Sequence, residues 1–216
     1  MIAPRGSGKS AWASFAYPFY AAVNGLEPFI QIISDTAGQA REWLENIRNE
    51  LEDNERLAQD YPAVCDPGPV WRQDRLVLRN GVVISALGTG SKIRGRRNRA
   101  QRPTLLILDD PENDEHVTSA IRRERSKRWF DRAVMNAGTP ATNILVLGTT
   151  LHADCLVMKL KRSAGWRTRT FQSIVEWPKR MDLWEAWEAL LNDWEDPERE
   201  AKALAFYDAN REAMEA

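Results

Sequence analysis

A glycine-rich segment near the start of the chain has the residue types that bind phosphate groups. Residues 3–10 read APRGSGKS and match the second half of the P-loop pattern G-x-x-x-x-G-K-[ST], with Ala3 where the first glycine would stand. Glycines let successive backbone N–H groups converge on phosphate oxygens, Lys9 would reach the β- and γ-phosphates, and the Ser10 hydroxyl would ligate Mg²⁺. The segment predicts a nucleotide site; the alternative is an ordinary glycine turn ahead of a helix.

Three carboxylates follow an apolar run in the middle of the chain. Leu105–Leu108 predicts a buried strand, and Asp109, Asp110 and Glu112 come within the next four positions. A carboxylate at the end of a buried strand beside the P-loop strand can hold Mg²⁺, and Asp109 fits that position. Asp110 or Glu112 could then polarise the attacking water, and the sequence leaves this choice open. A common Asp-Asp-Pro turn is the alternative interpretation.

A basic segment precedes the carboxylates. Between positions 89 and 102 it has no acidic residue and six basic ones, which are Lys92, Arg94, Arg96, Arg97, Arg99 and Arg102. We favour an arginine finger among Arg94, Arg97 and Arg99, which would stabilise charge on the γ-phosphate in cis or in trans. The alternatives are a loop that contacts the DNA backbone and a solvated loop with no role.

A Gly-Thr-Thr sequence ends the next apolar run, Asn143–Leu147. Thr149 and Thr150 could sense the γ-phosphate or the attacking water, although a turn with a helix cap is the simpler interpretation of these residues alone. His152 and Cys155 have a metal-like spacing, but no second cluster accompanies them, so we expect a loop and a helix cap rather than a metal site.

Strands that alternate with helices are expected to position these residues. The predicted strands are 29–33, 75–79, 82–85, 105–108, 143–147 and 167–175, and the predicted helices are 11–24, 37–53, 117–135 and 154–161. Asn80-Gly81 predicts a hairpin, and 54–70 an irregular connection. The pattern indicates an α/β three-layer domain with a mainly parallel sheet and an added β-hairpin. In such sheets function lies at the carboxyl ends of the strands.

Length and charge restrict the classes of protein further. The 216 residues are 43% apolar and 28% charged, which fits one medium globular domain, alone or with a docked tail. Residues 176–216 carry twelve acidic and five basic residues, so an acidic, tryptophan-rich helical tail follows a mildly basic body. The longest apolar stretch, 11–23, is interrupted by Pro18 and is shorter than a membrane span of roughly 20 residues. We therefore expect a soluble, cytoplasmic protein without a zinc site or a disulfide framework.

Taken together, these segments resemble the ATPase domain of the large terminase subunit of tailed bacteriophages, the motor that packages viral DNA. The resemblance rests on residues 3–10, 93–103, 105–112 and 147–152, which occur in the family's order. It implies an ASCE-type P-loop NTPase fold, with an added strand between the Walker strands. It also implies ATP and Mg²⁺ as cofactors and double-stranded DNA as the translocated substrate. The expected partners are a portal protein and a small terminase subunit around a ring homo-oligomer, in the cytoplasm of the infected bacterial host.

The resemblance assigns roles to individual residues. Lys9 becomes the Walker-A lysine, Ser10 and Asp109 become the metal ligands, and Arg5 matches a P-loop arginine that senses the γ-phosphate. Gly148 begins the motif that couples hydrolysis to DNA movement. The expected ATP-binding residues are Arg5, Gly6, Ser7, Gly8, Lys9, Ser10, Asp109, Thr149 and Thr150. The expected catalytic residues are Asp110, Glu112, Arg94, Arg97 and Arg99.

The sequence also departs from the family. The family usually has glutamate directly after the Walker-B aspartate, whereas here Asp110 occupies that position and Glu112 lies two positions further on. We expect an ATPase domain at 1–175 with its first strand largely missing, and a linker at 176–216 ahead of an absent nuclease domain, so that the chain is truncated at both ends. Because the first strand is reduced to Met1–Ala3, the loop should be poorly held and should bind nucleotide weakly.

Two other functions remain open at this stage. One is a different P-loop DNA motor, such as a helicase or a DNA-repair ATPase, although a second lobe does not fit into 216 residues. The other is a truncated remnant that binds DNA through residues 92–102 and does not hydrolyse ATP.

Overall fold

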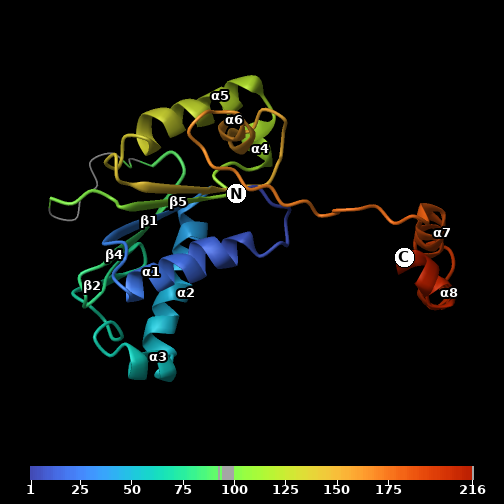
Figure 1. Cartoon of the computed structure of the whole chain (residues 1–216), viewed down its shortest axis with the longest axis horizontal. Helices are drawn as coiled ribbons and strands as arrows, with labels where there is room; N and C mark the ends of the chain where they lie inside the picture. The colour runs from blue at the N-terminus through green and yellow to red at the C-terminus, as the bar shows by residue number, and fades with distance from the viewer. Residues whose placement is uncertain (92, 94–99, 216) are drawn as a thin grey trace. The chain divides into compact units, whose positions relative to one another are not determined.

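A computed structural model describes residues 1–91, 93 and 100–215. The chain divides into two compact units, residues 1–171 and 172–216, which are described separately; the sequence had suggested a boundary after residue 175. The first unit is a six-stranded sheet with helices on both faces (Figure 1). The predicted α/β class, with its mostly parallel sheet, is confirmed.

The strands follow one another in the spatial order β2-β3-β4-β1-β5-β6. Their bounds are Val70–Arg72 (β2), Arg75–Val77 (β3), Val83–Gly88 (β4), Phe29–Ser34 (β1), Leu105–Asp109 (β5) and Asn143–Leu147 (β6). The predicted hairpin is confirmed, since β3 pairs antiparallel with β4 across Asn80-Gly81. The sequence missed β2, and it missed the helix α3, Glu55–Asp60, within the segment 54–70 that was expected to be irregular.

Four parallel strands form the centre of the sheet. Every residue of β4, β1 and β5 is buried, as their continuous apolar runs predict for strands covered on both faces. The register pairs Ser34 with Asp109 and Asp109 with Leu147. The residues after these three positions therefore emerge together at the carboxyl edge of the sheet.

The segment Met1–Ala3 continues the sheet beyond β6. Ile2 forms parallel bridges with Gly148 on one side and Thr170 on the other. Its N–H donates to the Arg169 carbonyl over 2.8 Å, and its carbonyl accepts from the Phe171 N–H over 2.9 Å. Ile2 and Ala3 are buried, so this first segment is held from both sides, and the expected weak binding of nucleotide stays a prediction.

Two further expectations at this edge need correction. The Asp109 strand, β5, does not lie beside the Ile2 segment, because β6 lies between them. The strand predicted at 167–175 is reduced to the single bridge at Thr170.

Helices cover the two faces of the sheet. On one face lie a π-helical turn η1 (Ala11–Ala16), α1 (Tyr17–Val23) and α2 (Ala37–Asp53), with α3 beyond them (Figure 1). On the other lie α4 (Asp114–Val117), α5 (Ala120–Trp129), the π-helical turn η2 (Phe130–Val134) and α6 (Leu156–Lys161). The helix predicted at 117–135 is confirmed as the continuous run of α5 and η2, which begins at Ala120 after a Ser119 cap, whereas the short helix α4, capped by Asn113, was missed.

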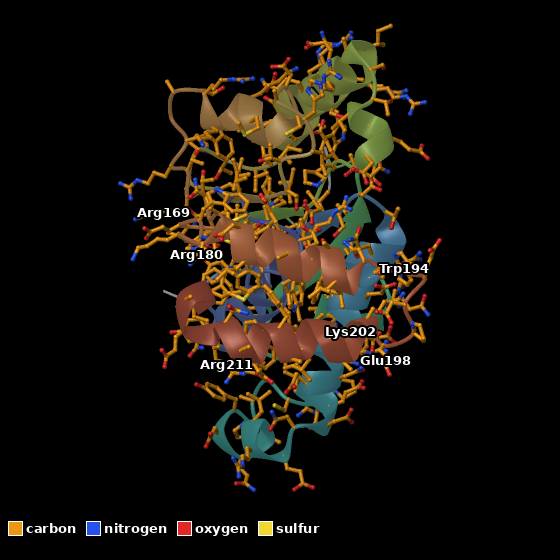
Figure 2. All side chains as sticks on the ribbon, turned by 90° about the vertical axis from the view of Figure 1, so that its right-hand side faces the viewer. Arg169, Arg180, Trp194, Glu198, Lys202 and Arg211 are labelled. Atoms are coloured by element: carbon orange, nitrogen blue, oxygen red, sulfur yellow. The ribbon has the colours of Figure 1, made fainter. Side chains whose placement is uncertain are left out.

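The second unit is a helical pair, as its sequence predicts. α7 (Met181–Leu191) and α8 (Arg199–Glu215) lie side by side, with Trp194, Glu198 and Lys202 at the end where they connect (Figure 2). The Trp184 indole donates to the Met214 carbonyl over 3.1 Å. Across the described part of the chain, no helix combines the length and the apolarity that crossing a membrane requires.

Candidate functional site

The loop 3–10 leaves the sheet at Ala3 and enters η1. Gly6 and Gly8 have φ angles of +78° and +73°, which L side chains rarely adopt, and an added Cβ at either would meet nothing within 4 Å. Within the described residues, the N–H groups of Gly6, Ser7 and Gly8 donate to no other group. The loop therefore presents open, unpaired backbone donors at the start of a helix, where anions are favoured.

Lys9 lies beneath this loop. Its side chain is only 8% exposed, and Nζ lies 2.8 Å from Asp110 Oδ2. The pair joins the loop to the first residue after β5, as the sheet register places it. A buried ammonium needs such a partner, because an isolated buried charge is costly.

The second contact joins Ser10 to Asp109. The Ser10 hydroxyl donates to Asp109 Oδ1 over 2.8 Å, and the carboxyl is 1% exposed. Burial raises the pKa of Asp109, and the hydrogen bond from Ser10 opposes that rise. Asp109 Oδ2 is buried and has no partner among the described residues. A hydroxyl beside a carboxylate with a free buried oxygen is a donor set that suits Mg²⁺.

This donor set is small. Nowhere in the described ranges do three or more His, Cys, Asp or Glu side chains gather in a metal-binding group. The fit to Mg²⁺ therefore rests on the Ser10 hydroxyl and the Asp109 carboxylate, as for an ion that takes its other ligands from phosphate and water.

Asp110 connects the loop with the segment after β6. Its φ of +42° is unusual for a residue other than glycine, and its Oδ1 accepts from the Thr149 N–H over 3.1 Å. The same carboxylate thus contacts Lys9 and Thr149. Strained backbone of this kind is common at functional sites.

Glu112 faces a different element. Its Oε2 accepts from the Leu156 N–H, the first residue of α6, over 2.6 Å. The side chain is 8% exposed, and Oε1 has no partner among the described residues. The two carboxylates that the sequence could not separate therefore have different surroundings, because Asp110 contacts Lys9 whereas Glu112 holds the start of α6.

The remaining predicted residues lie at varying distances from this centre. Arg5 pairs with Asp114 over 2.9 Å, and both side chains are exposed. Thr149 Oγ1 is buried without a partner in the described part, whereas Thr150 is exposed and its hydroxyl lies 3.8 Å from Met158 Sδ. The predicted arginine finger, Arg94, Arg97 or Arg99, lies outside the described residues.

A polar group at the end of β1 was not predicted from the sequence. Asp35 Oδ2 accepts from the Asn113 amide over 2.9 Å, and Asp35 Oδ1 lies 3.3 Å from His116 Nδ1. Asp35 does not cap the helix that follows, because Thr36 caps α2. A carboxylate directly after a buried strand was the available signal, because the same rule had identified Asp109.

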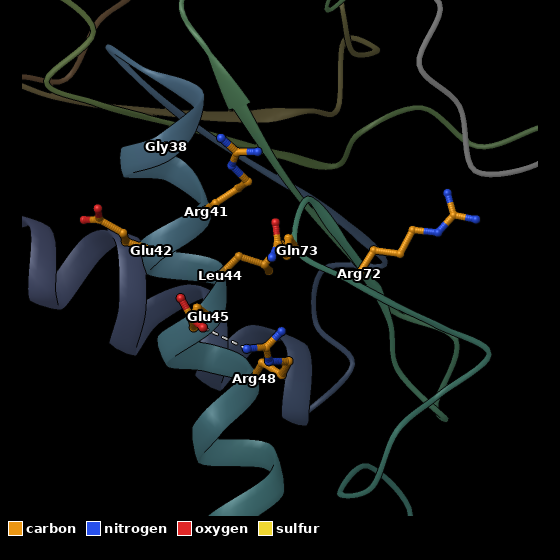
Figure 3. Close-up of a pocket in the computed structure, with 8 residues that line it drawn as sticks. All are labelled: Gly38, Arg41, Glu42, Leu44, Glu45, Arg48, Arg72 and Gln73. Carbon is orange, nitrogen blue, oxygen red and sulfur yellow. Dashed lines mark hydrogen bonds and ion pairs between the residues drawn. The ribbon is translucent and has the colours of Figure 1, made fainter.

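Part of this group, without Lys9, Ser10 and Asp109, lines a small pocket at the carboxyl edge of the sheet. It is lined by Arg5, Asp35, Gln39, Asp110, Glu112, Asn113, Thr149 and Leu151. A second pocket lies between α2 and the β2–β3 turn and holds none of the predicted site residues (Figure 3). There Arg48 pairs with Glu45 over 2.9 Å, while Glu42 is exposed without a pair among the described residues.

The chain matches no family model, and a search of curated proteins finds no similar sequence. The geometry of the loop and its carboxylates is therefore the basis for a functional conclusion.

Proposed function

We propose that the chain binds Mg²⁺ and ATP at the loop 3–10 and hydrolyses the nucleotide to move double-stranded DNA. The supporting observation is the pair of contacts that join this loop to the end of β5. Ser10 donates to Asp109 and Lys9 pairs with Asp110, each over 2.8 Å. Residues about a hundred positions apart in sequence thus form one polar centre.

The loop supplies the phosphate-binding part of the proposed site. Gly6, Ser7 and Gly8 offer unpaired N–H groups, and Lys9 supplies a positive charge below them. Convergent backbone donors with a lysine suit the linked phosphates of a nucleoside triphosphate. A turn without a function would not explain the buried lysine.

Ser10 and Asp109 would hold Mg²⁺. Bound there, the ion would neutralise charge on the phosphate oxygens. Asp109 is buried at some cost, which its raised pKa reflects, and its Oδ2 has no partner among the described residues. A carboxylate kept at such a cost is more characteristic of a functional site than of a structural turn.

Asp110 is the proposed catalytic carboxylate. It shares the Lys9 side chain with the phosphate site and is partly exposed, so water can reach it. Glu112 is proposed as a positioning residue, because one of its oxygens is engaged with the Leu156 N–H. With Asp110 as the catalytic carboxylate and Glu112 as a positioning residue, the proposed site does not need the glutamate that terminases usually have directly after the Walker-B aspartate.

The same two carboxylates suggest how hydrolysis would be coupled to movement. Asp110 bonds to the Thr149 N–H and Glu112 to the Leu156 N–H, so both contact the segment between β6 and α6. A change in charge at the carboxylates would act on this segment directly. The resemblance to terminases assigns it the coupling role.

The finer fold assignment also belongs to the proposal. β6 separates the Ile2 segment from β5, which is the strand arrangement of ASCE-type P-loop NTPases. The ring, the portal protein, the small terminase subunit and the host cytoplasm are proposed from the resemblance alone.

Calorimetric titration with ATP tests the nucleotide site. We expect binding by the wild type that depends on Mg²⁺, and a loss of about 10- to 100-fold for Lys9→Ala, since a hydrogen bond to a charged group contributes about 1.5–3 kcal/mol. Lys161→Ala removes an exposed lysine of α6 and is the matched control. Equal affinity in the wild type and Lys9→Ala, or no binding by a folded wild type, would refute the proposal.

A further inference from the structure

The outer helix of one sheet face carries a strong excess of positive charge. Residues 120–134, which form α5 and η2, contain six basic residues and two acidic ones. No residue of α5 itself is buried, and the segment is anchored through Phe130 and Val134 of η2. The solvent side of this layer is therefore available for contacts (Figure 1).

Both acidic residues of the segment are neutralised by lysines. Glu124 pairs with Lys159 of α6 over 3.4 Å, and Asp131 pairs with Lys127 over 2.5 Å. These pairs leave the arginines of the segment without a carboxylate from their own helix.

Two of the arginines are held by the neighbouring turn. Arg122 Nη1 donates to the Glu115 carbonyl over 3.0 Å and lies 3.9 Å from its carboxylate. Arg123 Nη1 donates to the Val117 carbonyl over 2.6 Å. These side chains link α5 to α4.

The other three form an arginine stripe, Arg125, Arg128 and Arg132. All three are exposed, and none has an ion pair or hydrogen bond with another described residue. Their spacing of three and four positions places them on one face of the helix, over about 10 Å at 1.5 Å per residue. Three positive charges thus lie in a row without compensation from the described part of the chain.

We infer that the arginine stripe binds the phosphate backbone of double-stranded DNA. Duplex DNA carries one phosphate per 3.4 Å of axis on each strand, so about 10 Å of stripe faces about three phosphates of one strand. Guanidinium groups suit this task because they bind phosphate oxygens in a fixed, often bidentate geometry. The inference deepens the proposed function, on which it rests, by naming a surface for its DNA.

A groove at the base of the stripe extends this surface toward the end of β4. It is lined by Thr89, Gly90, Glu115, His116, Arg122, Arg125, Ser126 and Trp129. Arg125 thus belongs to both the stripe and the groove, and Thr89 follows β4 at the same edge of the sheet as the candidate nucleotide site. DNA bound along the stripe would pass close to that edge.

The acidic unit 172–216 of another copy is the competing occupant. Several of its carboxylates already have partners within that unit: Arg180 holds Asp182 over 2.6 Å, and Lys202 holds Asp196 over 2.5 Å. Its charge is also spread over two helices and a connection rather than over one continuous line. These features favour duplex DNA.

Fluorescence anisotropy with a duplex of about 30 base pairs tests the inference through the salt dependence of the affinity. The variant replaces all three stripe arginines by glutamine. Each lost phosphate contact lowers the slope of log K against log salt by about 0.9, so we expect a decrease of about 2.7. Between 50 and 200 mM salt, the factor by which the variant loses affinity should therefore be about 40 times smaller than for the wild type.

The control replaces Arg56, Arg72 and Arg79 by glutamine. These arginines are exposed on α3, β2 and the β3–β4 turn, at the other end of the first unit, and the change in net charge is identical. We expect the wild-type slope from this variant. Circular dichroism and thermal melting verify that both variants fold.

Each outcome decides the question. A stripe variant with the wild-type slope, or a loss of slope equal to that of the control, overturns the inference. So does a stripe variant that changes only the oligomeric state in sedimentation, which would indicate the acidic unit of another copy. ATP hydrolysis by the wild type without DNA is measured separately. DNA binding through the stripe without hydrolysis would refute the nucleotide site alone, and hydrolysis without a stripe effect would refute the surface alone.

Discussion

Replacing Glu112 tests quantitatively the proposal that this carboxylate positions α6 while Asp110 is the catalytic carboxylate. Replacement by alanine removes the acceptor of the Leu156 N–H, a bond of 2.6 Å in a buried position. A buried donor without a partner costs about 1–3 kcal/mol. The buried methylene group that is lost with the carboxylate adds about 0.8 kcal/mol. Relief from burying a carboxylate offsets part of this, so we expect the free energy of unfolding to fall by about 2 kcal/mol.

Urea unfolding followed by circular dichroism measures this loss. For a unit of this size the melting temperature should fall by about 4–8 °C, at roughly 2–4 °C per kcal/mol. Glu112→Gln keeps an oxygen acceptor for Leu156 and should lie within about 1 kcal/mol of the wild type. Glu42→Ala, an exposed site on α2, is the control and should change stability by less than about 0.5 kcal/mol. Equal stability of Glu112→Ala and Glu42→Ala would refute the reasoning.

Three further predictions concern the site and its supports. Burial raises the pKa of Asp109, so stability falls as pH rises from the ordinary value of 3.8 through the raised one. In urea unfolding without Mg²⁺, Asp109→Asn should thus have a higher free energy of unfolding than the wild type at pH 7, and the two values should converge near pH 4. An equal difference at both pH values would contradict this. Gly148→Ala places a Cβ 2.6 Å from Val157 Cγ1 and should cost about 1–3 kcal/mol. Val157→Ala should recover part of it in a double-mutant cycle, whereas additive effects would exclude the clash. Asp110→Asn should lower ATP turnover by about 100-fold or more in steady-state assays, and near-normal turnover would remove Asp110 from the chemistry.

The sequence predicts the strands and their polar ends well. Continuous apolar runs locate β1, β5 and β6, and Asn80-Gly81 locates the hairpin. The parallel arrangement places the end of β5 and the loop 3–10 at the same edge of the sheet, and the contacts of Lys9 and Ser10 with the end of β5 reach past the intervening strand β6.

The parts that the sequence missed depend on tertiary contacts. The different contacts of Asp110 and Glu112 arise from a left-handed backbone at Asp110 and from the position of α6, which no local pattern contains. By length alone the segment Met1–Ala3 is too short for a strand, yet partners on both sides hold it. The break between α4 and α5 had a visible signal, because Ser119 is a favourable N-cap residue.

Steady-state hydrolysis of ATP with Mg²⁺ tests the central claim most directly. The wild type is compared with Lys9→Ala and Asp109→Asn, with Lys161→Ala and Glu42→Gln as matched controls at exposed sites. We predict turnover in the wild type and both controls and a loss of about 100-fold or more in the two site variants, because each removes a charge from the phosphate or metal site. Turnover that survives both site variants, or a folded wild type without turnover, would contradict the assignment of Lys9 and Asp109 to an ATPase site.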